Sequence, residues 1–206
     1  PRLRVDHEGL RRLLAWRQVR IDLYELLASE AHRSVSASIL RAFSLSADLL
    51  DDRFEWMGEH EALAFLHRNG SRDTRRMLDR LSSWKHLHCA AQVRLDEVRD
   101  GWAALPGDMT LRVAVEDAIA DGLGLPRADV AVYAGYSRRT KQIRTPMVGE
   151  AAASAAQVFG PDQPKLYTAA VFAPGHLRLR DDQVMQLLEE AVTRLGAGCA
   201  PSKTFF

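Results

Sequence analysis

The spacing of the apolar residues is the feature that most constrains this fold, because it changes near residue 105. Before that point, apolar side chains recur every three or four residues, which is the spacing of one face of a helix. Helices are predicted over four segments, 8–32, 35–50, 52–68 and 71–102. Asn69-Gly70 is a helix stop and Ser71 a good N-cap. Because the connections are short, we predict a bundle of about four helices with antiparallel neighbours.

The second half of the sequence mixes helical and strand patterns. Three helices are predicted, each opened by a capping residue, namely Asp108, Thr145 and Asp181. Glycines such as Gly124 close the first of these helices. Three short strands are predicted, two buried and the last an amphipathic edge strand, over 129–136, 165–173 and 177–180.

The predicted fold class is therefore α+β and predominantly helical. The 206 residues suit one large domain or two small ones, with the average composition of a globular protein. We predict a helical bundle over 1–105 and a smaller mixed α/β subdomain with two or three short strands over 106–196. Residues 197–206 read as a tail.

The balance of charge argues against two classes of partner. The formal net charge is +1, so no global field favours nucleic acid or an anionic membrane. No apolar run approaches the ~20 residues that a membrane span needs. The start of the sequence, Pro1-Arg2-Leu3-Arg4, lacks the apolar segment of a signal peptide. We therefore expect no membrane association, and nucleic-acid binding is disfavoured.

Two cysteines bear on the compartment. Cys89 falls in a predicted helix and Cys199 in the tail, which is neither a disulfide framework nor a metal-binding spacing. Two free thiols fit a reducing compartment, so a cytoplasmic location is expected.

A basic segment after the predicted strand 129–136 is the strongest candidate for a ligand site. Ligands gather at the carboxyl ends of strands in strand–helix–strand units, and the start of the next helix offers N–H groups to an anion. The predicted ligand-binding residues are cations and hydroxyls that suit phosphate or a carboxylate: Ser137, Arg138, Arg139, Thr140, Lys141, Arg144 and Thr145. No glycine-rich nucleotide fingerprint accompanies them, so a solvated basic loop is the alternative reading.

Catalytic and metal signatures are missing from the sequence. It contains no Cys-x-x-Cys or His-x-x-x-His pair, and no Gly-x-Ser-x-Gly. In a helix His86 and His88 would point to different sides, so they could not chelate together. No metal or cofactor is expected, and whether the protein is an enzyme is left open.

Two further patterns have alternative readings. All four tryptophans, Trp16, Trp56, Trp84 and Trp102, fall in predicted helices, which favours core anchors over a partner-binding surface. Arginines share one helical face at 72, 76 and 80, with Arg75 beside them. They could hold nucleic-acid phosphates, but the nearby Asp73 and Asp79 favour a solvated surface.

The leading functional hypothesis is a regulatory or protein-interaction module that binds a partner protein through its helical half, without a catalytic constellation of its own. The alternative is an enzyme or sensor that binds a small phosphorylated or carboxylated ligand at the basic loop 137–145. Nucleic-acid binding through the arginine face ranks third.

Overall fold

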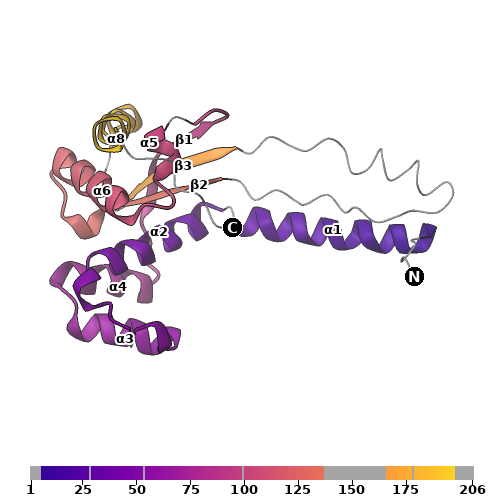
Figure 1. Cartoon of the computed structure of the whole chain (residues 1–206), viewed down its shortest axis with the longest axis horizontal. Helices are drawn as coiled ribbons and strands as arrows, with labels where there is room; N and C mark the ends of the chain where they lie inside the picture. The colour runs from indigo at the N-terminus through magenta and orange to yellow at the C-terminus, as the bar shows by residue number, and fades with distance from the viewer. Residues whose placement is uncertain are drawn as a thin grey trace. The chain divides into compact units, whose positions relative to one another are not determined.

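The computed structural model describes six stretches of the chain, residues 6–27, 29–52, 54–98, 100–136, 166–177 and 179–197. They divide between two compact units. In the first unit the described element is helix α1 (His7–Leu27) (Figure 1). The second unit holds every other described helix and strand.

A three-stranded antiparallel sheet forms the centre of the second unit. Its strands are β1 (His88–Leu95), β2 (Ala131–Tyr136) and β3 (Tyr167–Ala173), in the order β1-β3-β2. Val171 of β3 lies opposite Ala91 of β1 and Val132 of β2. The apolar β3 takes the central place because it is buried on both faces.

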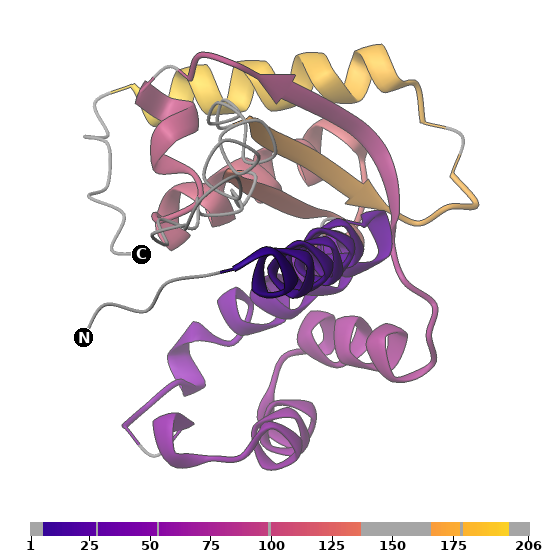
Figure 2. The same ribbon diagram turned by 90° about the vertical axis from the view of Figure 1, so that its right-hand side faces the viewer.

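Three helices cover one face of the sheet: α5 (Asp100–Ala104), α6 (Met109–Leu123) and α8 (Asp181–Gly196) (Figure 2). Alternate residues of β3 point to this side, because side chains of a strand alternate between the two faces. The resulting core cluster includes these buried residues: Leu105, Val115, Ile119, Val130, Val132, Tyr167, Ala169, Val171, Val184, Leu188 and Val192.

The opposite face of the sheet packs on α2 (Glu30–Ser44), which in turn packs on α4 (Arg72–Ser82), and α3 (Glu59–Asn69) packs on α4 (Figure 2). Their shared core contains Ala37, Ala42, Leu66, Met77, Leu78, Leu87, Ala131, Ala170 and Phe172. Short 3-10 helices complete the unit: η1 (Ala47–Leu49), η2 (Phe54–Trp56) and η3 (Arg127–Asp129).

The predicted class, α+β and predominantly helical, is confirmed, but the predicted fourth helix over 71–102 is wrong beyond Ser82. Residues 88–95 form β1 instead, so Cys89 lies in a strand. In the sequence Ala91, Val93 and Leu95 alternate with polar residues, which is the period of two that is typical of a strand. Pairing with the buried β3 decides between the two patterns. β1 lies before residue 105 in the sequence and pairs with β3, which lies after it. The predicted limits of the two parts of the chain, 1–105 and 106–196, stay a prediction.

The predicted edge strand over 177–180 is also wrong. Leu177, Leu179 and Arg180 belong to no strand, and the Leu177 N–H donates to the Pro174 carbonyl in a turn (3.0 Å). The third strand of the sheet is β1. Both other predicted strands are confirmed, as β2 within 129–136 and β3 within 165–173.

The predicted helix bounds 8–32, 35–50 and 52–68 are wrong at most of their ends, because the structure has α1 (His7–Leu27), α2 (Glu30–Ser44) and α3 (Glu59–Asn69). The ends that rest on a specific capping or stop residue are confirmed at three places. Helix α3 ends at Asn69, and the Ser71 hydroxyl accepts from the Thr74 N–H at the start of α4. Helix α6 ends at Gly124 in the left-handed region (φ 65°). The predicted cap Asp181 is wrong: it is the first residue of α8, and Arg180 occupies the N-cap position without a side-chain bond.

The two aspartates give a matched test of capping. The Asp108 carboxylate accepts from the Leu111 N–H (2.9 Å), so Asp108→Ala is expected to lower the free energy of unfolding by about 1 kcal/mol. Asp181 only faces the helix dipole, so Asp181→Ala should cost roughly 0.3 kcal/mol. Urea denaturation of both variants measures the difference, and equal losses would contradict this assignment of caps.

Candidate functional site

Two tryptophans stand almost fully in solvent. Trp56 in η2 is 88% exposed, and Trp84, just after α4, is 82% exposed. The interpretation of the tryptophans as core anchors is wrong for both, and Trp16 of α1 is half exposed. Trp102 does pack on the core, with its ring edge-on to Tyr167 (centroids 6.3 Å apart). Large exposed aromatic side chains are the residues that most often anchor partner proteins.

Trp84 has a backbone conformation that bulky residues seldom adopt. Its φ is 56°, in the left-handed region that usually holds glycine after a helix. This position ends α4: the Trp84 N–H donates to the Leu81 carbonyl (3.3 Å) and the Lys85 N–H to the Arg80 carbonyl (3.0 Å). The conformation costs about 1–2 kcal/mol relative to glycine. The side chain recovers little of this by packing, because it is 82% exposed, although its ring lies edge-to-face with that of His86 (centroids 5.6 Å apart).

A shallow hollow of about 360 Å³ lies between α3 and α4. Its lining is largely apolar, from Leu63, Ala64, His67 and Arg68 of α3 and Leu78, Leu81 and Ser82 of α4. The exposed Trp84 follows Ser82 by two residues. Trp84 therefore follows directly after the residues of α4 that line the hollow.

The arrangement of α3 and α4 depends on the turn between them. A Cβ on Gly70 would lie 2.5 Å from the Leu66 carbonyl oxygen, so this position needs glycine. Behind the turn, the buried Thr74 hydroxyl bonds the Ser46 hydroxyl (2.8 Å) and so ties α4 to the end of α2. At the surface, His67 Nε2 lies 2.8 Å from Asp79 Oδ1 and links α3 to α4 beside the hollow. These contacts hold the two walls of the hollow together.

The predicted arginine face divides into two pairs. Arg76 and Arg80 bind Asp129 (2.8 and 2.5 Å), and Arg80 also donates to the Ala128 carbonyl (2.7 Å). These bonds attach α4 to η3, so two of the four cations are engaged inside the protein. Arg72 and Arg75 are exposed, as a solvated surface requires.

A buried ion network that sequence reasoning missed joins α2 to α6. The Arg41 side chain is fully buried and contacts Glu116 (3.1 Å), Asp117 (2.5 Å) and the Arg127 carbonyl (3.2 Å). The other Glu116 oxygen accepts from the Val132 N–H of β2 (2.9 Å). A signal was present, because Glu116 lies next to Val115 and three residues before Ile119, within the apolar stripe of its helix.

Burial raises the pKa of Glu116 to about 7. The Arg41 guanidinium, the Val132 N–H and the Arg112 guanidinium oppose this rise, and Asp117 adds to it. A carboxyl that titrates near neutrality is often catalytic. Here both oxygens bond to the protein itself and the side chain is 1% exposed, so the network is a structural tie between α2, α6 and β2.

The predicted anion site falls outside the described residues. This applies to every residue proposed for it, Ser137, Arg138, Arg139, Thr140, Lys141, Arg144 and Thr145, and to the predicted helix 146–159. One premise of that prediction is wrong: β2 and β3 are antiparallel, so the rule for ligands at the carboxyl ends of parallel strands does not apply. The anion site itself stays a prediction.

Cys89 lies in β1 and is partly buried. Burial, followed by the nearby Glu30, raises the pKa of the Cys89 thiol, and the Cys89 N–H donates to the Glu30 carboxylate (3.0 Å). Among the described residues, no three or more His, Cys, Asp or Glu side chains gather closely enough to hold a metal ion.

Comparison with known proteins adds no relatives: no family model, curated protein or solved structure matches the chain. Within the stretches that the structure describes, no helix combines the length and apolar character needed to cross a membrane.

Proposed function

We propose that this chain is an interaction protein that binds a partner protein through the surface of α3, α4 and their flanking tryptophans, Trp56 and Trp84. The observation that carries the proposal is Trp84, which combines an unfavourable backbone conformation with a side chain that is 82% exposed. Strain of this kind persists where the surroundings enforce it, and it concentrates at functional positions. The partner is expected in the cytoplasm, the compartment predicted from the two cysteines.

The energetics of tryptophan support this choice of surface. Burial of a tryptophan removes about 150–250 Å² from water, and truncation of such an anchor usually costs about 2 kcal/mol or more of binding energy. Two exposed tryptophans are therefore enough to dominate the affinity of a modest interface. In the free protein this apolar area contributes to neither of the two core clusters.

The proposal predicts a stoichiometric partner that depends on Trp84. Purification of the chain from its native cells is expected to bring one partner with it, and the dissociation constant is then measured by calorimetry. Trp84→Ser should raise that constant about 30-fold, which corresponds to about 2 kcal/mol. Because the side chain is exposed, the thermal midpoint of the free protein should not fall.

Leu50→Ser is the control, because Leu50 is another exposed apolar residue (38%) and lies at the end of η1. It should leave the dissociation constant unchanged. Equal affinity of wild type and Trp84→Ser for every co-purified protein would overturn the proposed function.

A further inference from the structure

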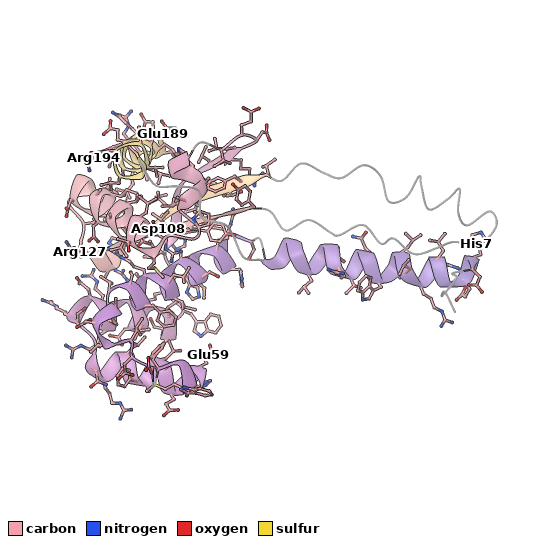
Figure 3. All side chains as sticks on the ribbon, viewed as in Figure 1. His7, Glu59, Asp108, Arg127, Glu189 and Arg194 are labelled. Carbon is pink, nitrogen blue, oxygen red and sulfur yellow. The ribbon has the colours of Figure 1, made fainter. Side chains whose placement is uncertain are left out.

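Helix α1 exposes a stripe of apolar residues, which we call the α1 stripe: Trp16, Val19 and Leu23. They follow one another at intervals of three and four residues, so their side chains lie on one face of the helix. Each is between 49% and 65% exposed. In Figure 3, His7 marks the start of this helix.

The opposite side of α1 is also apolar, but it is covered. Leu10 and Leu14 lie about two and a half turns before Val19 and Leu23, which places them on the far side of the helix. Leu10 is buried and Leu14 is half-buried. Apolar residues on two opposite sides are typical of a helix that packs on both. The α1 stripe is the side that is left open.

The charges at the two ends of the stripe have opposite signs. Arg12 lies on the face of the stripe, one turn before Trp16, and Asp22 directly precedes Leu23. Arg12 contacts Glu8 (3.2 Å), and the Asp22 carboxylate accepts from Gln18 (2.8 Å). All of these side chains are exposed, and exposed contacts of this kind are weak. Arg12 and Asp22 can therefore exchange these contacts for an ion pair with another molecule.

We infer that the α1 stripe is the interface between two copies of this chain, whose α1 helices pack side by side in opposite directions. Trp16 of one copy then lies against Val19 of the other. In this register Arg12 of each copy lies opposite Leu23 of the other copy, within reach of its Asp22. Two-fold symmetry repeats each contact, so the stripe is covered and two ion pairs form. This inference goes beyond the proposed function and does not depend on it.

The charges favour the antiparallel direction. In a parallel pair, each residue of the stripe meets its own counterpart, so the two Arg12 guanidinium groups would repel each other at the interface. Arg20 borders the middle of the stripe, with its guanidinium over the Trp16 ring (4.7 Å to the centroid). In the antiparallel register it lies opposite Ala15 of the other copy, which carries no charge.

A second copy is a better match for the stripe than a lipid surface. A helix that lies on a membrane has a strongly polar side opposite its apolar side. The side of α1 opposite the stripe carries Leu10 and Leu14 instead. Because three side chains from each copy form most of the interface, we expect a weak dimer that dissociates on dilution.

Sedimentation equilibrium of the full chain, over about a hundredfold range of concentration, tests for this dimer. We expect a monomer–dimer equilibrium, and Val19→Glu should raise its dissociation constant at least about tenfold, because it places a charge at the centre of the stripe. Since Val19 is mostly exposed, circular dichroism should show an unchanged fold. Leu50→Glu is the control, because Leu50 is an exposed apolar residue outside α1, and it should leave the constant unchanged.

Charge reversal tests the direction of the helices. Arg12→Asp and Asp22→Arg should each weaken the dimer about fivefold, and the double variant should restore it, because both ion pairs form again with their signs exchanged. Arg11→Asp is the matched control. Arg11 also contacts Glu8 and is as exposed as Arg12, but it lies off the face of the stripe, so its reversal should have no effect.

Three results would overturn the inference. One is a chain that stays monomeric at every concentration, and another is a dimer that Val19→Glu leaves intact. The third is a double variant that is as weak as its two single variants combined, since antiparallel packing requires the rescue. If a monomeric chain binds vesicles of anionic lipid and Val19→Glu abolishes that binding, the stripe contacts a membrane and the inference fails as well.

Discussion

Replacement of Arg41 by methionine is expected to lower the free energy of unfolding by about 3 to 5 kcal/mol at pH 8. The Arg41 side chain is fully buried and is the common partner of Glu116 and Asp117. Without it, the Glu116 carboxylate loses its cation in a site that is 1% exposed, and an unpaired buried charge is costly. Urea denaturation at pH 8 measures the loss.

The same substitution should cost less at pH 5, where Glu116 is protonated in the folded protein because its pKa is raised to about 7. Arg11→Met provides a control for the loss of an arginine ion pair at the surface, since Arg11 contacts Glu8 with both side chains largely exposed. That variant is expected to lose less than about 1 kcal/mol. A loss for Arg41→Met as small as that of Arg11→Met would show that the network contributes little to stability.

The parts of the fold that sequence predicted well are those decided by local chemistry. Ser71 and Asp108 form the caps expected of them, because a hydroxyl or carboxylate before a helix satisfies a free N–H whatever the tertiary context. Strand β3 was recognisable from its continuous apolar run. β1 was not, because Ala91, Val93 and Leu95 fit both a helical and a strand pattern until β3 is present to pair with them.

The candidate site was harder to predict, because it depends on which residues the fold leaves uncovered. Trp102 and Trp84 are the same residue type and both fall in the segment predicted as a helix, yet one packs against Tyr167 and the other is 82% exposed. No periodicity distinguishes them. Trp84 lies in solvent because its backbone is left-handed at the end of α4. Glycine is the residue that usually predicts this conformation, so a tryptophan at the same position does not indicate where the helix ends.

Stability should fall as the pH rises from about 4.5 to about 7, by at most about 3 kcal/mol from Glu116. In the unfolded chain this carboxyl ionises near 4.5, whereas burial holds its pKa near 7 in the folded protein. Between these values the folded state binds more protons than the unfolded state. The contribution of Glu116 is therefore greatest below pH 4.5 and is lost as the pH passes through 7.

Comparison with Glu116→Gln isolates this contribution from the other titrating groups. Glutamine keeps an oxygen that can accept from the Val132 N–H, but it has no proton to lose. The difference in free energy of unfolding between wild type and this variant should decline steadily across that pH range. Asp182→Asn provides a contrast. The exposed Asp182 carboxylate accepts hydrogen bonds from Arg180, which lower its pKa, so any change in the free energy of unfolding that this variant causes lies at more acidic pH. A difference for Glu116→Gln that is constant from pH 4.5 to 7 would mean that Glu116 ionises equally in both states, and that Arg41 fully offsets its burial.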